Sequence, residues 1–488
     1  TVAASFRESF LERRLRFAEH GTTLGRDTMA GVTTFVVMSY IIFVNPSILA
    51  GVKPVHGAAL PFAAVLTSTC LVAGVMSILM GLTTNYAFAI APGMGLNAVV
   101  AYGLVASGNA TFPEAMGLVI LEGVAMLLLA VSGLREMIFR AIPLELKKAI
   151  AIGIGLFIAF IGLYNSGIIA QDKSGADPVT LGSFTTWPIF VTVFGLVFTF
   201  AMRAIRFRGD LLVGIVGTTI VATLVNRGTD YSAFGRGGVA SWPGFHHLYA
   251  GPDFSLIGNV SLHSFSAGEL GVVASLVWVF SLFLSDFFDF SGTSIGVGKS
   301  AGYVDANGDI PQFKKALIVD GLAAVAGGGA SASSATTYIE SGSGVAAGGR
   351  TGWVAVVAGL LFFPFMFVSP LIGMVPAQAT AAALVVVGWL MISTLTEAEG
   401  EAEGAAASKL AGIDFHDLAI GLSAALTIMV MPFTYSITNG IGFGFITYTL
   451  ICASRREWKR VHPFMWAATG AFVLYFLVPV LQQHISWF

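Results

Sequence analysis

The chain has 488 residues, of which 56% are hydrophobic and 11% are charged, and its net charge at pH 7 is −2. Soluble globular proteins carry about 25% charged residues, so this composition excludes a soluble enzyme and indicates a protein dissolved mainly in lipid. A net charge near zero gives no reason to expect a nucleic-acid partner. The two cysteines, Cys70 and Cys452, stand in apolar runs and form no ligand cluster or disulfide framework.

Apolar segments follow one another along the whole chain. The N-terminal stretch Ser5–His20 is charged and amphipathic, which predicts a helix on the membrane surface. A spanning helix needs about 20 apolar residues. Fourteen segments are predicted, at 29–50, 58–81, 93–106, 112–132, 145–168, 186–203, 210–226, 268–290, 315–330, 341–348, 351–373, 377–394, 416–433 and 437–453. The third and tenth are too short to span as helices, and a run at 464–481 could add another crossing.

Basic residues give the expected orientation. They cluster on one side of the predicted crossings, which the positive-inside rule assigns to the cytoplasm together with the N-terminus. The stretch from Asn226 to Ser266 then lies outside, and the acidic stretch Glu397–Glu403 lies in a cytoplasmic loop. The clusters are Arg13, Arg14, Arg16 and Arg26; Arg135, Arg140, Lys147 and Lys148; Arg203, Arg206 and Arg208; Lys299, Lys314 and Lys315; and Arg455, Arg456, Lys459 and Arg460.

The two sets of seven segments resemble repeats of one unit. Short strings recur in the same order: Ile142-Pro143-Leu144 and Val375-Pro376-Ala377, 214–217 and 442–445, and 90–95 and 339–344. Because seven is odd, two such units have opposite topology in the membrane. Inverted repeats of this kind are typical of secondary transporters.

The third and tenth segments look interrupted. Asn85–Ile90 and Ser333–Ile339 have strand character, and both are followed by Gly or Pro residues that allow a turn into a half-helix. Extended backbone at bilayer depth must be shielded from lipid, so the two strands are expected to pair near the midplane. The half-helix N-termini would then point donors at that centre. Two ordinary kinked helices are the alternative.

Carboxylates at membrane depth are the strongest candidates for function, because burying a charge there is costly. Asp286 and Asp289 share one face of segment eight, and Glu340 stands at the break of segment ten. A buried carboxyl group can hold and release a proton. A structural pair or helix cap is the alternative for each, most of all for Asp286.

Neighbouring residues could complete a pocket around these carboxylates. The ring of Phe88 could stack on a flat ligand. Polar groups at the same depth come from Asn45, Asn97, Thr293, Thr337 and Asn439. A helix–helix hydrogen bond by Asn97 and a packing role for Phe88 remain open. No metal cluster, nucleotide-binding loop or nucleophile–base pair is apparent in the sequence.

Eight strings along the chain carry a family resemblance: 30–35, 40–46, Ala89–Ala98, Asp286–Asp289, 292–293, Thr337–Ser341, 348–352 and 431–437. They resemble the AzgA-like purine permeases of the nucleobase–ascorbate transporter superfamily. The similarity extends in order over nearly the whole chain. Phe290, Gly342 and Ser343 depart from the usual pattern of that family, as does the acidic stretch Glu397–Glu403.

The resemblance implies an all-α polytopic membrane fold of seven plus seven inverted segments, with strand breaks in segments three and ten. It implies a core domain of segments 1–4 and 8–11 and a gate domain of segments 5–7 and 12–14. It also implies a homodimer and no cofactor. The expected division is 1–28 N-terminus, 29–132 core, 133–227 gate, 228–266 extracellular loop, 267–373 core, 374–455 gate and 456–488 tail.

The leading hypothesis is a plasma-membrane importer of adenine, guanine and hypoxanthine driven by protons. Glu340, Asp289, Phe88, Asn97, Thr337 and Thr293 would bind the purine, with backbone N–H groups at Gly93 and Gly95, and Asp289, Glu340 and Asp286 would carry the proton. One alternative is another substrate, such as uracil, xanthine, ascorbate or a purine-like hormone. A channel or anion exchanger is a further alternative, although it would favour a basic residue near the half-helices.

Overall fold

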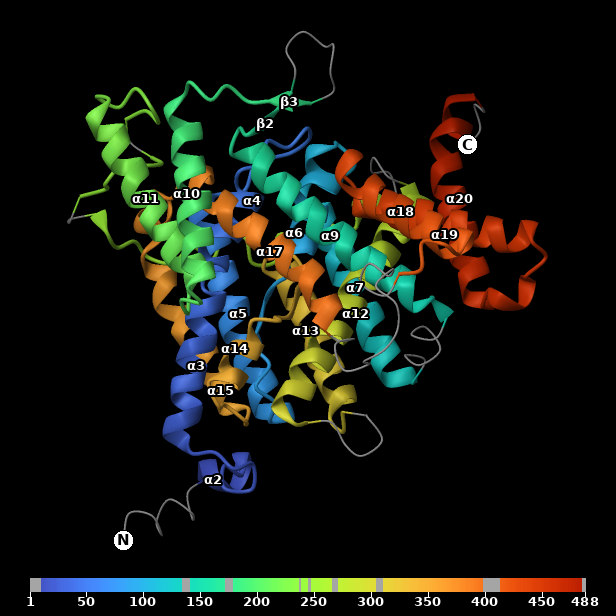
Figure 1. The fold of residues 1–488 in the computed structure, drawn as a ribbon, viewed down its shortest axis with the longest axis horizontal. Helices are drawn as coiled ribbons and strands as arrows, with labels where there is room; N and C mark the ends of the chain where they lie inside the picture. The colour runs from blue at the N-terminus through green and yellow to red at the C-terminus, as the bar shows by residue number, and fades with distance from the viewer. Residues whose placement is uncertain are drawn as a thin grey trace.

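The computed structural model describes residues 10–133, 141–171, 179–236, 238–244, 247–265, 271–303, 310–397 and 413–484. Arg135, Arg140 and most of the acidic stretch Glu397–Glu403 lie outside these ranges. Within them, eight helices are long and apolar enough to cross a membrane, and further apolar helices of 10–17 residues accompany them. The molecule is therefore a helical, multi-pass membrane protein (Figure 1).

The first half of the chain follows the predicted order of segments. Segment one is a helix broken at Ser39 and Tyr40, and segment three is a strand followed by a half-helix that continues as a π-helix. Between segments five and six the structure contains a short antiparallel strand pair, β2 with β3, which the sequence did not predict. The elements are α2 (Phe10–Leu15), α3 (Leu24–Met38), α4 (Ile41–Leu49), α5 (Phe62–Thr84), β1 (Ile90–Pro92), α6 (Met94–Ala98), η1 (Val99–Ala106), α7 (Phe112–Ser132), α9 (Leu144–Asn165), β2 (Ile169–Ala170), β3 (Thr180–Leu181), α10 (Trp187–Ala204) and α11 (Asp210–Gly228).

The second half repeats this plan. A long helix and a second helix precede a strand and its half-helix, and an additional C-terminal helix covers the run predicted at 464–481. The elements are η3 (His263–Phe265), α12 (Gly271–Ala301), α13 (Phe313–Gly329), β4 (Ala335–Thr337), α14 (Ser341–Ala346), α15 (Trp353–Phe362), η4 (Phe363–Phe367), α16 (Ser369–Ile372), α17 (Ala377–Glu397), α18 (Leu418–Phe433), α19 (Ile437–Ser454), η5 (Trp458–Arg460) and α20 (Pro463–His484).

Segment eight is longer than predicted. Its helix α12 continues to Ala301, whereas the prediction ended at residue 290. The helix continues through the small residues after Phe290, and the last of its glycines allows a neighbouring side chain to pack closely. At Gly298 a Cβ atom would lie 2.8 Å from the side chain of Ile310.

The two interrupted segments meet inside the protein, as the sequence predicts. Strands β1 and β4 pair antiparallel, with Ile90 opposite Thr337 and Pro92 opposite Ala335. All six strand residues are buried. The backbone groups of these strands therefore satisfy one another, as any extended segment away from water requires.

The predicted strand limits are wrong at both ends of the pair. Residues 85–89 lie outside the ladder. Asn85 ends α5 in the left-handed conformation, and side chains satisfy the N–H groups of Ala87 and Ala89. Ala87 donates to the hydroxyl of Tyr303 at 3.0 Å, and Ala89 donates to the hydroxyl of Ser341 at 3.0 Å. In the second half the strand ends at Thr337, and the next residues turn into α14.

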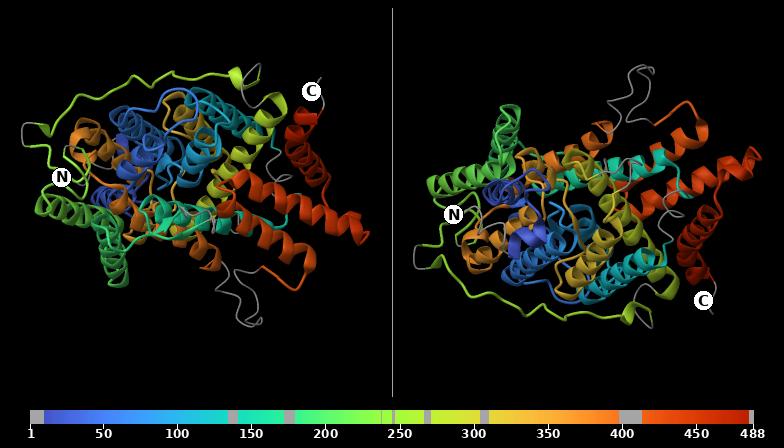
Figure 2. Two further views of the ribbon diagram at one scale, coloured as in Figure 1. Left: turned by 90° about the horizontal axis from the view of Figure 1, so that it is seen from above. Right: turned by 90° about the horizontal axis from the view of Figure 1, so that it is seen from below.

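The helices pack in two groups. In one group α7 packs on α13, and α15 packs on α3 and α5. In the other, α9 packs on α17 and α18, and α10 packs on α11 and α17. Between α11 and α12 the chain runs along one face of the molecule (Figure 2). There it hydrogen-bonds to elements of the first group, because the Ala250 N–H donates to the Phe367 carbonyl of η4 and the Ser261 N–H donates to the Pro113 carbonyl of α7.

Part of the N-terminal amphipathic stretch Ser5–His20 packs against the rest of the protein. Only Phe10–Leu15 of it forms a described helix. The side chains of Leu15 and Phe17 are buried in the protein, and the side-chain amide of Asn85 donates to the Leu15 carbonyl at 2.9 Å. Part of the apolar face predicted to contact lipid therefore packs against the end of α5.

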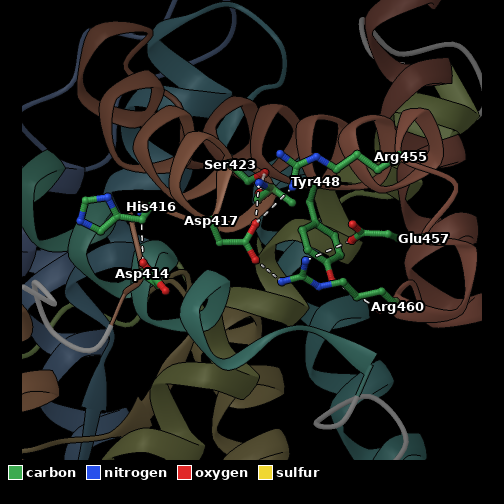
Figure 3. A network of polar contacts seen from close by, with 9 residues as sticks. Asp414, His416, Asp417, Ser423, Tyr448, Arg455, Glu457 and Arg460 are labelled. Carbon is green, nitrogen blue, oxygen red and sulfur yellow. Dashed lines mark hydrogen bonds and ion pairs between the residues drawn. The ribbon is translucent and has the colours of Figure 1, made fainter. Parts of the chain in front are cut away.

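A polar network ties the start of α18 to the end of α19 (Figure 3). Asp417 caps α18 by accepting from the Ala419 N–H at 3.0 Å, and it pairs with Arg460 and, at 4.0 Å, with Arg455. Burial opposes ionisation of Asp417, but the hydrogen bonds and charge of Arg460 outweigh it and hold the pKa of this carboxyl below its usual value.

We expect Asp417→Asn to lower stability by about 0.2–1 kcal/mol at pH 7, because the cap survives but the ion pair is lost. A group with a lowered pKa in the folded state stabilises above its unfolded pKa and loses that contribution as pH falls through the folded value. The difference in apparent melting temperature between parent and variant should thus disappear in acid. A difference that persists unchanged below the pKa of Asp417 would contradict the assignment.

Candidate functional site

Glu340 stands at the centre of the fold, between the paired strands and the half-helix α14. It occupies the N-cap position of α14, and its side chain is 8% exposed. The hydroxyl of Tyr40 donates to its Oε1 atom at 2.7 Å. Tyr40 itself lies at the break between α3 and α4, so two interrupted segments converge on one carboxylate.

Asp289 faces the same region from α12. It lies within electrostatic range of Glu340, Tyr40 and Tyr338, and it is the less buried of the two carboxylates. No hydrogen bond to another described residue occupies its side chain. Thr293 follows one turn further along α12 and is also buried. Asp289 and Glu340 thus lie within electrostatic range of each other, and of the two only Glu340 accepts a hydrogen bond from a described side chain, that of Tyr40.

The glycines at the first half-helix have structural duties. The Gly93 N–H donates to the Ser334 carbonyl at 2.8 Å, extending the strand pairing. A Cβ atom at Gly95 would lie 2.7 Å from Ile154 of α9, so this glycine permits close packing of α6 on α9. In the second half-helix the Gly342 N–H donates to the Ile339 carbonyl at 2.9 Å. The N–H groups of Gly93 and Gly342 are therefore already paired.

Phe88 lies inside an aromatic cluster. It is fully buried, with ring centroids 5.2 Å from Tyr86 and 5.9 Å from Tyr303. Tyr86 and Tyr303 stack on each other at 4.4 Å. In this conformation the ring of Phe88 packs against protein, and its predicted stacking on a ligand stays a prediction.

Asn97 is a buried amide with no hydrogen-bond partner in the part of the chain that the structure describes. Its side chain is 0% exposed, and neither its oxygen nor its nitrogen forms a hydrogen bond with any described residue. A buried polar group left unpaired costs about 1–3 kcal/mol, so such groups need an explanation. A ligand that pairs with this amide would supply one.

A second group of carboxylates lies behind β4, from three different helices. Glu122 of α7 and Asp286 of α12 lie next to one another without an aligned hydrogen bond, and Asp320 of α13 lies beside them. All three are 0% exposed. Ser334 donates to Glu122 at 2.9 Å, whereas both oxygens of Asp286 are unpaired among the described residues. The described residues include no group of three or more such side chains placed to hold a metal ion.

Asp320 holds the second strand in place. It accepts from the N–H of Thr337 at 2.9 Å and from the hydroxyl of Thr337 at 3.1 Å, and the hydroxyl of Thr336 lies 3.2 Å away. The side chain of Thr337, predicted to bind substrate, is thus engaged by Asp320. Asp320 replaces the neighbouring strand that the edge of β4 lacks.

We expect Asp320→Ala to reduce folded protein strongly, because one buried N–H and two hydroxyls lose their acceptor at about 1–3 kcal/mol for the N–H alone. The measurement is the yield of monodisperse protein and its apparent melting temperature. Asp253→Ala is the matched control, because Asp253 accepts one N–H, from Ser255, at the surface. Equal effects of the two substitutions would show that Asp320 does not support β4.

Three of these residues are missing from the sequence prediction. Tyr40 lies in an apolar run and resembles a packing residue until its contact with Glu340 is known. Glu122 and Asp320 are single carboxylates within apolar segments. The cost of burying a charge, which pointed to Asp289, applies equally to both and would have found them.

The model of the permease family designated Xan_ur_permease matches residues 25–401. The chain belongs to this permease family. The permease is 37% identical to the adenine permease AdeQ of Escherichia coli, over 95% of each chain, and 35% identical to the guanine/hypoxanthine permease PbuG of Bacillus subtilis, over 95% of this chain and 98% of that one. It is also 37% identical to the putative permease MJ0326 of Methanocaldococcus jannaschii, over 96% and 98%. The predicted relationship to purine permeases is confirmed.

Solved structures share the fold of this permease. The transmembrane domain of the cyanobacterial bicarbonate transporter BicA superposes with a TM-score of 0.60 at 15% identity, covering 84% of this chain and 97% of that one. SLC26A9 superposes with a TM-score of 0.58 at 12% identity, covering 93% and 68%. At this identity the likeness concerns the fold alone, and it agrees with the predicted inverted-repeat transporter architecture.

Proposed function

We propose that this permease imports purine nucleobases by proton symport with alternating access. The observation that supports this most directly is the pair Glu340 and Asp289, two acceptors that face one region beside paired strands at the centre of the protein. The names of the relatives, adenine permease and guanine/hypoxanthine permease, support the choice of purines. In this role the protein is a transporter and no enzyme.

The purine would bind between the strand pair and α12. Glu340, held by Tyr40, would accept hydrogen bonds from ring N–H groups, and Asp289 would bind the opposite edge. The unpaired amide of Asn97 can both donate and accept, which suits the mixed edge of a purine. Thr293 would add a hydroxyl from the next turn of α12. Phe88 and Thr337 would support the site from behind, since other residues already contact them.

The coupling proton would be held by the carboxylates. Asp289 and Glu340 lie at the substrate site, so a proton there would change the pattern of donors offered to the purine. Asp286 lies on the same helix as Asp289 and next to Glu122. Two unshielded carboxylates this close favour sharing one proton. We therefore assign Asp286, with Glu122, to a proton site one helical turn from the substrate.

Alternating access would move two packed groups of helices against each other. The group around α7, α13 and α15 holds the site and would form the core, and the group around α9, α17 and α18 would form the gate. Gly95 touches Ile154 across this boundary. That contact would separate and close again as the core exposes the site to each side.

The permease would act in the plasma membrane as a homodimer. Its N-terminus would face the cytoplasm, as the distribution of Lys and Arg favours. The stretch from Thr229 to Phe265, which connects α11 to α12, would lie outside.

The decisive experiment is uptake of labelled adenine, guanine and hypoxanthine into proteoliposomes with and without an inward proton gradient. Accumulation that requires the gradient is the expected result. Unlabelled uracil, xanthine, ascorbate and bicarbonate are added as competitors to test whether the protein carries another substrate. Uptake of one of these in place of purines, or a current without stoichiometric uptake, would overturn the proposal.

A further inference from the structure

An apolar groove opens beside α11, away from the carboxylates. Its volume is about 630 Å³. It lies between α11 on one side and α3, α4, η4 and α16 on the other, so residues of both helix groups form its walls. Its walls include Phe35, Leu212, Val216, Ile220, Leu224 and Phe365.

The groove offers nothing to a polar ligand. No charged side chain lines it. Its three hydroxyls each donate to a carbonyl of their own helix: Ser39 to Val36 at 3.0 Å, Thr219 to Ile215 at 2.8 Å, and Thr223 to Thr219 at 2.8 Å. An occupant therefore needs only methyl and methylene groups.

The length of the groove matches one lipid chain. From Leu212 to Leu224, α11 rises by about 18 Å at 1.5 Å per residue. One leaflet of the hydrocarbon core is about 15 Å thick. Val216 and Ile220 are 44% and 55% exposed on the wall of the groove, so its side is open to the bilayer.

Cations stand at one end of the groove. The turn that joins α10 to α11 carries Arg206 and Arg208, both exposed and without an ion pair among the described residues. Gly209 in this turn packs on Val36 of α3, beside groove residue Phe35. The neighbouring Arg203, in contrast, forms an ion pair with Asp210 at 3.0 Å. Two arginines are therefore left to face the headgroups of the adjacent leaflet.

We propose that the groove binds one acyl chain of an anionic phospholipid, whose phosphate contacts Arg206 and Arg208. Charge and apolar length are both matched by this occupant. Because the acyl chain would contact both helix groups, the bound lipid would bridge the two parts of the transporter. The site is independent of the proposed substrate and would stand if the substrate were another molecule.

The test is native mass spectrometry of the delipidated, purified protein titrated with phosphatidylglycerol and with phosphatidylcholine of the same chains. We expect one tightly retained phosphatidylglycerol and weaker retention of phosphatidylcholine. Each arginine near an anionic lipid is worth about fivefold in affinity, so Arg206→Gln with Arg208→Gln should remove the preference. Arg227→Gln, at the opposite end of α11, is the matched control and should retain it.

Blocking variants test the groove itself. Thr219→Phe should fill it and abolish retention of both lipids, and Thr223→Phe is a second such variant if the first does not fold. Val197→Phe adds the same bulk on exposed α10 and should change nothing. Equal retention of the two lipids by the parent, or full retention by the folded blocking variants, overturns the proposal. So does a shift from dimer to monomer in the blocking variants with lipid retention unchanged, since the groove would then be a contact between two copies.

Discussion

Glu340→Gln is expected to lower purine affinity by about 10- to 100-fold, because a hydrogen bond to a charged acceptor contributes about 1.5–3 kcal/mol. Glutamine keeps the size of the side chain and an oxygen that can accept from Tyr40, so the local structure should survive. The charge that strengthens bonds from purine N–H groups is lost. Binding to purified protein, by calorimetry or scintillation proximity, measures the effect separately from transport.

Two further variants distinguish a binding role from a structural one. Tyr40→Phe removes the donor to Glu340 and should weaken binding less, by about five- to tenfold, because the carboxylate remains. Glu145→Gln, at the start of α9, is the control for loss of one negative charge and should bind as the parent does. Unchanged purine affinity in folded Glu340→Gln would remove Glu340 from the site.

The fold was predictable wherever the bilayer constrains the length and polarity of a segment. Runs of about 20 apolar residues have few alternatives in lipid, and α7 has the limits 112–132 that its run of apolar residues indicates. The strand pair was predictable because Pro92, Gly93 and Gly342 interrupt segments too short to span. Its limits were not, because Tyr303 and Ser341, more than 200 residues away, accept the hydrogen bonds of the Ala87 and Ala89 N–H groups.

The site was predictable only where a single residue is costly on its own. Asp289 and Glu340 are such residues, and the structure brings them together. Tyr40 acquires its role through a partner 300 positions away, which no local pattern contains. Glu122 and Asp320 carry the same signal as Asp289, yet their shared location depends on how α7, α12 and α13 pack.

Asp286→Asn is expected to abolish proton-driven accumulation while leaving purine exchange in place. The variant keeps the shape of the side chain but cannot carry a proton. One pH unit is worth 1.36 kcal/mol, so a one-to-one symporter under that gradient concentrates substrate about tenfold, and an uncoupled variant should approach about onefold. Uptake into proteoliposomes with the membrane potential clamped measures accumulation, and counterflow without a gradient measures exchange.

The location of Asp286 makes this result specific. Its two oxygens have no partner among the described residues, and it lies next to Glu122, so Glu122→Gln should shift the pH dependence of uptake in the same experiment. Asp289→Asn should instead weaken exchange and accumulation together, because we propose that Asp289 binds the substrate. Undiminished accumulation by folded Asp286→Asn would assign the proton to Asp289 or Glu340 alone. If exchange falls as much as accumulation, Asp286 takes part in substrate binding. Protonation of Asp286 would then be needed to bind the purine as well as to carry the coupling proton.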